Sequence, residues 1–429
     1  MELRISVALF LGCSGIATGF GALRSFVAVV ADARHAASTP LTHVEAAAAA
    51  SSFVDSIGVN VHNGYSASPY GREPERIAKL VAELGVRHLR EETSPGQTKL
   101  CGLDRRYAAS GVHFDFIVSP GETDAQLRGW QSCSAPAAEA YEGYNEYDLS
   151  GDPNWVTALQ AAQRQVYAFG SGLGVTVVGP SLTTEKAYAS LGTVPADTGN
   201  MHDYFSGHSP DSAGWGDKTR FGIYGSPAYF IAVARQTTGP APMWSTETGY
   251  GDAPKGRWSV SALTKMHYEL RTLFEHWNAG VRRTYLYELL DEGNGDFDSY
   301  GLVDATLAPK PAFVAVAALL RHLAGAGSKA AGVDYSLTAP PAVEHTLLAL
   351  RPGRFVLALW NDSPEWDPRI AKSVYVDPEP VTLTFRHVPH ALSLTTFASS
   401  GEPIARALAS ESSVSFAVDG GVSLLDLTM

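Results

Sequence analysis

The sequence lacks any cluster of basic side chains. It contains 32 Lys+Arg against 44 Asp+Glu, which gives a formal net charge of −12. A groove for nucleic acid needs a stripe of Lys and Arg, so we expect no nucleic-acid partner. Charged residues make up only 18% of the chain and hydrophobic residues 45%, a balance that argues against global disorder and allows a large buried core.

Several catalytic and metal-binding motifs are also absent. No Gly-x-Ser-x-Gly turn occurs, which argues against an α/β-hydrolase. His202 and His208 have no partner at zinc spacing, so we expect no metal, and nothing in the sequence predicts a cofactor. An acidic stretch surrounds Gly293 and Gly295, but its spacing does not match a calcium loop, and we interpret it as a solvated loop. Its acidic members are Glu288, Asp291, Glu292, Asp296 and Asp298.

The N-terminal residues differ from the rest of the chain. Arg4 precedes an apolar run over residues 5–23, and Arg24 separates it from a second apolar stretch that small residues follow. We interpret residues 1–37 as an export signal or an uncleaved membrane anchor, and therefore expect a periplasmic, secreted or membrane-anchored protein. A lipoprotein cleavage site at Cys13 is a weaker alternative. Residues 38–54, rich in alanine, are expected to form a flexible leader.

Two cysteines remain beyond this segment. Cys101 and Cys133 both follow predicted strands, and a pair of cysteines in an exported protein predicts one disulfide. Two unrelated thiols are the alternative.

Eight short apolar runs recur along residues 55–325, most of them followed by a helical pattern. The runs are Ser56–His62, Val86–Glu92, His113–Pro120, Ala140–Asp148, Val175–Leu182, Met201–Gly207, Met243–Tyr250 and Arg283–Leu290. Near-continuous apolar strands that alternate with helices indicate parallel strands covered on both faces. The number of units predicts a (β/α)8 barrel. A doubly wound sheet is the alternative, but no glycine-rich phosphate loop follows the first run.

The pattern changes after Gly325. Residues 326–429 contain short strand-like runs separated by Pro, Gly, Asn and Asp, without helical periodicity. This part of the chain predicts a C-terminal antiparallel β-sandwich domain.

Two glutamates stand at the ends of predicted strands, where a parallel barrel carries its chemistry. Glu146 ends the stretch Tyr-Glu-Gly-Tyr-Asn-Glu of the fourth strand, and Glu247 lies in Ser-Thr-Glu-Thr-Gly-Tyr of the seventh. Two carboxylates a few ångströms apart can cleave an acetal, one giving a proton to the leaving oxygen and the other attacking the anomeric carbon. The alternative for either glutamate alone is a solvated surface residue.

These stretches resemble the clan A retaining glycoside hydrolases. Tyr141 to Glu146 is similar to the β-xylosidase-type family 39 and less closely to the cellulase-type family 5, and Gly-Leu-Val-Asp at 301–304 resembles the segment after strand eight. The resemblance implies that Glu146 is the general acid/base and Glu247 the nucleophile. It also implies an oligo- or polysaccharide substrate with a β linkage.

The resemblance assigns supporting roles to further residues. Asn145 would bond the sugar 2-hydroxyl, Arg90 would hold Glu247 ionised, and Tyr204, with His202 beside it, would position the nucleophile. The alternatives are a loop-capping amide for Asn145, a surface ion pair with a neighbouring glutamate for Arg90, and a core histidine for His202. His62 and Asn63, at the end of strand one, are candidates for sugar contacts or for loop hydrogen bonds.

The strand-eight region departs from the family pattern. The family has an aromatic residue there that floors the −1 sugar, usually a tryptophan, whereas this chain has Tyr287 and Glu288. Trp130 and Tyr250, with Trp215 and Trp258, fall in predicted loops and are candidates for stacking on sugars or for loop packing. Two rival functions therefore stay open: a non-hydrolytic glycan-binding barrel, and a transglycosylase that remodels an exopolysaccharide. We expect membrane contact only through an N-terminal anchor.

Overall fold

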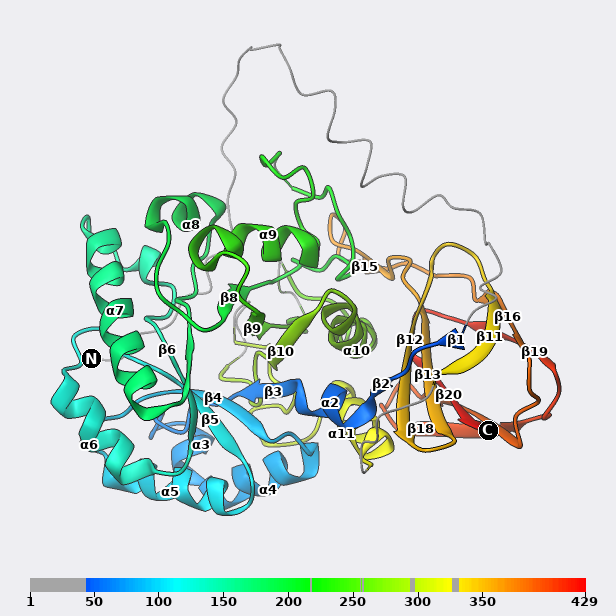
Figure 1. Cartoon of the computed structure of the whole chain (residues 1–429), viewed down its shortest axis with the longest axis horizontal. Coiled ribbons are helices and arrows are strands. Elements are labelled where there is room, and N and C mark those ends of the chain that lie inside the picture. The colour runs from blue at the N-terminus through cyan, green and yellow to red at the C-terminus, as the bar shows by residue number, and fades with distance from the viewer. Residues whose placement is uncertain (1–43, 217, 255, 257, 294–297, 326–331) are drawn as a thin grey trace, which may run out of the picture.

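The computed structural model describes residues 44–216, 218–254, 256, 258–293, 298–325 and 332–429 (Figure 1). The expected signal or anchor at residues 1–37 lies outside this range, as do Asp296 and the first residues of the expected leader. Within the described ranges, no helix combines the length and apolar character needed to cross a bilayer.

Eight parallel strands form the barrel, and they follow one another around it in chain order. They are β3 (Ile57–Asn60), β4 (His88–Glu92), β5 (His113–Ile117), β6 (Ala138–Glu142), β7 (Thr176–Val178), β8 (Gly199–His202), β9 (Met243–Thr248) and β10 (Val281–Leu286). A parallel bridge between Val178 and Thr198 joins β7 to the segment leading into β8. Each strand falls on one of the eight predicted runs, and the predicted (β/α)8 barrel is confirmed.

Helices cover the outside of the barrel. They are α3 (Pro69–Arg72), α4 (Pro74–Leu84), α5 (Thr98–Ala109), α6 (Asp124–Ser134), α7 (Trp155–Leu173), α8 (Glu185–Leu191), α9 (Pro227–Thr238), α10 (Ala262–Asn278) and α11 (Pro311–Leu323). In α4 the buried residues recur every three or four positions, which is the spacing of one helical face. The helix ends at Gly85, whose φ of 88° suits a residue without a side chain.

The C-terminal part is a sandwich of two mostly antiparallel sheets, as predicted (Figure 1). Its strands are β11 (Val333–Thr338), β12 (Val343–Arg351), β13 (Arg354–Asn361), β16 (Glu379–Phe385), β17 (Ala391–Phe397), β18 (Pro403–Leu408), β19 (Ser413–Val418) and β20 (Ser423–Thr428). A small ribbon of β14 (Trp366–Asp367) and β15 (Lys372–Ser373) lies outside the two sheets.

The segment expected to be a flexible leader belongs to the fold from Val44 onward. Strand β1 (Val44–Glu45) pairs with β11, and β2 (Ala48–Ala49) pairs with β12, so each sheet of the sandwich gains an N-terminal strand. Helix α2 (Ala50–Asp55) then leads into the first barrel strand. The chain thus crosses the sandwich before it enters the barrel, which alanine composition alone did not reveal.

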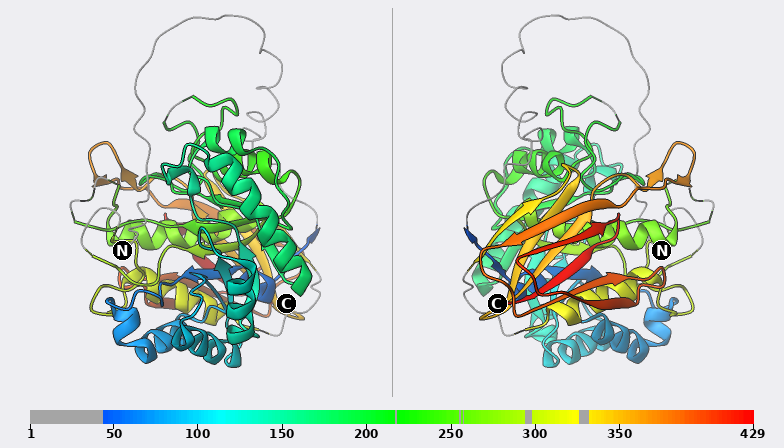
Figure 2. Two further views of the ribbon diagram at one scale, coloured as in Figure 1. Left: turned by 90° about the vertical axis from the view of Figure 1, so that its left-hand side faces the viewer. Right: turned by 90° about the vertical axis from the view of Figure 1, so that its right-hand side faces the viewer.

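The barrel and the sandwich share buried residues. The sandwich lies on one side of the barrel (Figure 1), and in the right-hand view of Figure 2 it is in front of the barrel. Trp360 of β13 is fully buried, stacks on Phe274 of α10 and donates a hydrogen bond to Glu275 Oε1 at 2.9 Å. Arg271 of the same helix donates to the carbonyl oxygen of Gly420 at 2.6 Å. These contacts fix α10, and through it the adjacent strands β9 and β10.

Cys101 and Cys133 form a disulfide in the structure. The bond joins the first turn of α5 to the last turn of α6, and the two Cα atoms are 5.6 Å apart. It therefore ties together two neighbouring helices on the outside of the barrel.

Candidate active site

Polar side chains from four strands meet at the carboxyl ends of the barrel strands. Arg90 comes from β4, Glu142 from the last position of β6, His202 from the last position of β8, and Glu247 from β9. All four are buried. Glu146 lies in the loop beyond β6 rather than on the strand itself, because β6 ends at Glu142.

The backbone of Glu146 adopts a left-handed conformation, with φ 43° and ψ 41°. Such a conformation costs a residue other than glycine about 1–2 kcal/mol, so the surrounding contacts must hold it in place. The backbone N–H of Glu146 donates to Ser181 Oγ at 3.3 Å, and a short 3-10 helix over Tyr147–Leu149 begins at the next residue. The turn brings the Glu146 carboxylate over the barrel interior.

Arg90 is the central cation of the site. Its Nη1 donates to Glu247 Oε1 at 2.7 Å and to Asn60 Oδ1 at 3.0 Å. Its Nε and Nη2 bind Glu142 in a fork at 2.8 and 2.7 Å. Among the described residues, the ion pairs of Arg90 are with Glu142 and Glu247 and not with its neighbours Glu91 and Glu92. The surface ion pair considered above is therefore not formed, and the guanidinium instead links two buried carboxylates.

Glu247 is held in its ionised form. Burial alone would raise its pKa, but His202, Arg90 and a hydrogen bond from Tyr204 outweigh that effect and lower it. The Tyr204 hydroxyl donates to Glu247 Oε2 at 2.8 Å, and Arg90 donates to the other oxygen. Both oxygens of Glu247 are therefore oriented.

His202 lies between the two glutamates. Its Nδ1 is 2.8 Å from Glu146 Oε1 and 3.5 Å from Glu247 Oε2. One imidazole nitrogen and one carboxylate oxygen of each glutamate lie within 4.8 Å of one another. Glu146 and Glu247, which are 101 positions apart in sequence, thus face one another across a single imidazole.

The pKa values of Glu146 and His202 are both raised. For Glu146 the main cause is burial, with a smaller contribution from the charge of Glu247, while His202 opposes the shift. Burial would lower the pKa of His202, but the charges of Glu247 and Glu146 outweigh it. These shifts favour a proton on the pair of His202 and Glu146 and favour the ionised form of Glu247.

Hydrogen bonds fix the orientation of the His202 ring. The Thr246 hydroxyl donates to Asn200 Oδ1 at 2.7 Å, which leaves its oxygen to accept from His202 Nε2 at 3.1 Å. The Asn200 amide nitrogen in turn donates to the Gly179 carbonyl. This chain places an N–H on Nε2 and turns Nδ1 toward the two glutamates.

Two residues of this network were not singled out from the sequence. Glu142 supplies the fork for Arg90, and Asn60 accepts from the same guanidinium. A carboxylate at the last position of β6, one strand removed from the strand that carries Arg90, is a signal that could have identified Glu142. Asn60 offers no such signal, because asparagine at a strand end is common in loops.

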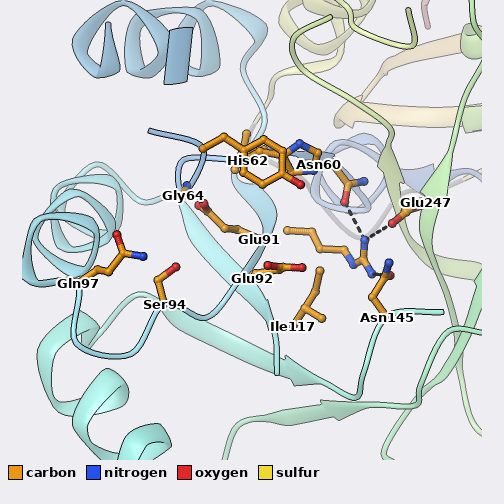
Figure 3. A pocket seen from close by; sticks show the side chains of 13 residues that line it. Asn60, His62, Gly64, Glu91, Glu92, Ser94, Gln97, Ile117, Asn145 and Glu247 are labelled. Carbon is orange, nitrogen blue, oxygen red and sulfur yellow. Dashed lines mark hydrogen bonds and ion pairs between the residues drawn. The ribbon is translucent and has the colours of Figure 1, made fainter. Parts of the chain in front are cut away.

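A cavity of about 170 Å³ opens beside Arg90 and Glu247 (Figure 3). Its walls come from the ends of β3, β4 and β5 and from the loop after β6, and its lining includes Asn60, His62, Glu92, Asn145 and Glu247. Asn145 Oδ1 accepts from Arg90 Nη2 at 2.8 Å and from Ser181 at 3.2 Å. Because its oxygen is occupied, the Asn145 amide nitrogen is left as a donor beside the cavity.

His62 lines the cavity, but Asn63 does not. The Asn63 side chain is buried and donates to Glu91 Oε2 at 2.6 Å, and the N–H of Gly64 donates to the other oxygen of Glu91 at 2.9 Å. Of the two sequence candidates at the end of strand one, only His62 is placed for contact with a ligand. Asn63 holds the loop.

The region after β10 differs from the solvated loop that we expected. Tyr287 and Glu288 are buried, and Asp291 binds Lys310 at 2.7 Å. The Tyr287 ring lies near His62 and Tyr204, with ring centroids 5.8 and 6.3 Å away. Glu288 and Asp291 are therefore packed rather than solvated, whereas Glu292 and Asp298 are exposed as expected. Tyr287 lies where the departure from the family pattern was noted.

Two of the aromatic candidates do not reach the cleft. Trp130 of α6 is buried and packs edge-on against Phe116. Tyr250 is buried against Phe205 and donates to the His208 carbonyl at 2.8 Å. Their rings are part of the core and cannot stack on a sugar in this structure. Sequence periodicity did not distinguish these loop-flanking positions from exposed ones.

No family model matches the sequence. No curated protein matches it either.

Solved structures do match the chain. A family 39 glycoside hydrolase from Bacteroides cellulosilyticus has a TM-score of 0.52 and 12% identity, over 88% of this chain and 82% of that one. A glucosidase from Croceicoccus marinus has a TM-score of 0.51 and 12% identity, over 91% and 97% of the two chains. An α-L-arabinofuranosidase from Thermotoga maritima has a TM-score of 0.54 and 10% identity, over 92% and 98%.

These similarities extend over both parts of the molecule. The matched regions cover about nine-tenths of this chain and therefore include both the barrel and the sandwich. The two-part architecture, and not the barrel alone, is shared with these glycoside hydrolases, one of which belongs to family 39. The fold that the resemblance implied is therefore confirmed. At such low identity the comparison establishes the fold, and the chemistry has to be argued from the site.

Proposed function

We propose that the protein is a retaining glycoside hydrolase that cleaves a β-linked oligo- or polysaccharide by double displacement. The observation that carries the proposal is the Glu146–His202–Glu247 group. Its ligand-facing atoms lie within 4.8 Å of one another, and the pKa values of its two carboxylates are shifted in opposite directions. Retaining enzymes hold their carboxylates about 5–5.5 Å apart, whereas inverting enzymes separate them by about 6.5–9.5 Å to admit a water molecule.

In the first step the Glu247 carboxylate attacks the anomeric carbon and forms a glycosyl ester. The bond from that carbon to the leaving oxygen breaks, and the oxygen takes the proton held between Glu146 and His202. Arg90 and Tyr204 orient the attacking carboxylate. As Glu247 loses its charge, the Arg90 guanidinium remains paired with Glu142.

In the second step water hydrolyses the ester. Glu146 takes a proton from the water as it attacks the anomeric carbon, and the Glu247 carboxylate leaves. Loss of the Glu247 charge in the intermediate removes one of the influences that raise the pKa of Glu146, which suits its change from acid to base. The sugar keeps its original configuration, and no step uses a cofactor.

Asn145 is proposed to recognise the sugar at the reacting centre. Its oxygen is occupied by Arg90 and Ser181, so its amide nitrogen is the group that can donate to the 2-hydroxyl. That contact strengthens in an oxocarbenium-like transition state. His62 and Tyr287 would lie next to the same sugar, on the side opposite Asn145.

Glycosidase activity also agrees with the structural relatives, which are described as a family 39 glycoside hydrolase, a glucosidase and an α-L-arabinofuranosidase. The β linkage rests on the sequence resemblance alone. We further propose an exported protein, on the basis of the apolar N-terminal residues and of the Cys101–Cys133 disulfide.

Product release from a panel of bacterial and plant polysaccharides tests this proposal. Wild type is run beside Glu146→Ala and Glu247→Ala, and mass spectrometry sizes the products, with and without added acceptor sugars. Shorter products from wild type, lost in both variants, are expected. Longer products in the presence of acceptors would indicate transglycosylation. Binding without turnover, unchanged in both variants, would exclude the hydrolase and favour a glycan-binding barrel.

A further inference from the structure

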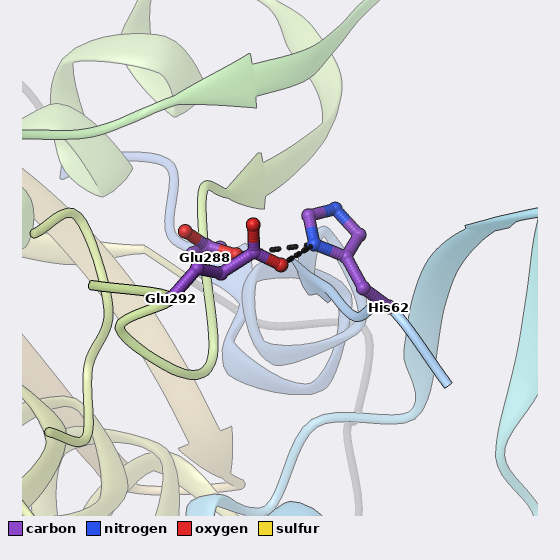
Figure 4. Close-up of side chains that lie close together, drawn as sticks. All are labelled: His62, Glu288 and Glu292. Atoms are coloured by element: carbon purple, nitrogen blue, oxygen red, sulfur yellow. Dashed lines mark hydrogen bonds and ion pairs between the residues drawn. The ribbon is translucent and has the colours of Figure 1, made fainter. Parts of the chain in front are cut away.

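A second cluster of metal-ligating side chains lies at the rim of the barrel, beside the cavity. It consists of His62, just beyond β3, and of Glu288 and Glu292, in the loop beyond β10 (Figure 4). One nitrogen of the imidazole and one oxygen of each carboxylate lie within 4.8 Å of one another. We propose that this cluster binds a divalent transition-metal ion of the zinc or manganese class.

The environment of the Glu288 side chain points to a ligand. Its side chain is fully buried, and neither of its oxygens has a hydrogen-bond partner. The contact that it makes is with His62 Nδ1, 3.3 Å from Oε2, and both carboxylates are directed at the same edge of that ring (Figure 4). A buried carboxylate without donors is costly, and coordination to a cation is one of the few ways to satisfy it.

The charges around the cluster leave room for a cation. Within the described residues, no arginine or lysine forms an ion pair with Glu288 or Glu292, and His62 is their shared partner. The two nearby lysines are occupied elsewhere: Lys310 binds Asp252 and Asp291 at 2.7 Å, and Lys265 binds Glu269 at 3.3 Å. Two carboxylates therefore meet a single imidazole.

The other His–carboxylate group, Glu146–His202–Glu247, is unsuited to a metal ion. Arg90 Nη1 donates to Glu247 at 2.7 Å, and Arg90 Nη2 lies 3.4 Å from the imidazole. A guanidinium at these distances repels a second cation, and it already occupies one oxygen of Glu247. In the part of the chain that the structure describes, no such charge contacts the cluster of His62, Glu288 and Glu292.

The donor set indicates the class of ion. An imidazole with two carboxylates suits zinc or manganese, whereas calcium and magnesium prefer sites built from oxygen ligands alone. Zinc sites with three protein ligands keep a further position open. Here that position would lie on the solvent side of the cluster, because His62 and Glu292 are 12% and 25% exposed while Glu288 is fully buried. The ion would also tie the end of β3 to the loop after β10.

Metal binding to the tag-free full chain tests the site without any substrate. After treatment with EDTA, the protein is dialysed against ZnCl2, MnCl2 or CaCl2, and bound metal is measured by plasma mass spectrometry. One zinc or manganese ion per chain is expected, with calcium at least tenfold weaker. Glu288→Gln and His62→Gln should each weaken the binding at least tenfold. Glu92→Gln, which alters another cavity carboxylate, and Glu247→Gln should leave it unchanged.

Thermal unfolding provides the control for folding. In EDTA, Glu288→Gln should unfold at or above the wild-type temperature, because the carboxylate it replaces has no hydrogen-bond partner. Zinc or manganese should raise the wild-type unfolding temperature and leave that of Glu288→Gln unchanged. The proposal is overturned if neither ion binds stoichiometrically, if binding survives Glu288→Gln, or if Glu247→Gln abolishes it. These outcomes do not depend on whether the chain hydrolyses glycans.

Discussion

At the scale of single residues, the site is organised by which groups hold a proton. Arg90 and Tyr204 supply donors to both oxygens of Glu247, while Glu146 is buried with His202 as its close partner. The lowered pKa of Glu247 and the raised pKa of Glu146 follow from these different partners. Environment, rather than residue type, assigns the two glutamates to different roles.

Replacement of His202 tests this division of protonation. His202 lowers the pKa of both glutamates, so both values should rise in His202→Gln. In the pH profile of kcat/KM, activity falls at low pH as Glu247 takes up a proton, and it falls at high pH as Glu146 loses its proton. Both limbs should therefore move to higher pH, with kcat reduced about tenfold or more. The exposed His387 provides the control, since His387→Gln should leave the profile unchanged. A profile that is also unchanged in His202→Gln would contradict the assignment.

The sequence identified the site residues that lie in recognisable motifs. It missed those that are set apart only by a hydrogen bond to a residue on another strand. Glu146 and Glu247 were named from strand ends, and Arg90 and Tyr204 from the family resemblance. The structure brings these side chains together. Glu142 and Asn60 were missed because their partner, Arg90, comes from another strand. Trp130 and Tyr250 were expected near the cleft but are buried in the core. A position in a predicted loop does not show whether a side chain is packed in the interior.

At the scale of elements, close contact between the ends of β9 and β10 fixes the position of Glu247. Gly249 lies two residues after Glu247, and a Cβ atom there would be 2.4 Å from the Tyr287 carbonyl oxygen. That distance is too short for any side chain, so the glycine sets how closely the two strand ends approach.

Gly249→Ala should therefore impair catalysis more than folding. The substitution forces β9 and β10 apart, and a displacement of about 1 Å at the proposed nucleophile, Glu247, can reduce turnover about 100-fold. Steady-state kinetics with far-UV circular dichroism would detect a large loss of kcat with retained secondary structure. Gly172→Ala in α7 is the control, because a Cβ there meets nothing within 4 Å. Equal effects of the two substitutions would contradict the role of Gly249.

The Cys101–Cys133 disulfide should contribute to stability rather than to catalysis. It closes a loop with a sequence separation of 32, for which loop-closure entropy predicts a stabilisation of about 2–4 kcal/mol. The Cys101→Ser/Cys133→Ser variant should unfold at a lower temperature than wild type while keeping its kcat. Reductant should lower the wild-type transition and not that of the variant. A wild-type transition insensitive to reductant would exclude a stabilising disulfide.

At the scale of the whole molecule, the barrel and the sandwich are parts of one packed structure. Core residues of both belong to the same buried cluster, and the N-terminal strands β1 and β2 pair with the sandwich before the chain enters the barrel. The contact is centred on Trp360, which stacks on Phe274 and donates to the buried Glu275. We expect the two parts to unfold together.

Trp360→Ala should lower the stability of the entire chain. Loss of a buried tryptophan side chain costs about 3–5 kcal/mol, and the substitution also leaves the Glu275 carboxyl without its donor. Differential scanning calorimetry should show one transition in wild type and one transition at a lower temperature in the variant. Two separate transitions, of which only one shifts, would show that the sandwich folds independently of the barrel.

The architecture was largely predictable from the sequence because buried parallel strands produce apolar runs. All eight barrel strands fall on such runs. In the sandwich, β11 and β18 were not among the predicted strands. The residues of β18 are mostly exposed and show no apolar alternation. Strands β1 and β2 have two residues each, and their partners lie about 290 residues further along, so no local pattern could reveal them.

Chemical rescue with azide tests the roles of the two glutamates most directly. With an activated β-glycoside of a sugar that the wild type hydrolyses, Glu146→Ala should form a glycosyl ester on Glu247, and azide should then release a β-glycosyl azide. In Glu247→Ala, azide should take the place of the nucleophile and give the α-glycosyl azide, with nuclear magnetic resonance distinguishing the anomers. The account predicts these two opposite products. Exchanged anomers, or no azide product from either variant of an active wild type, would contradict it.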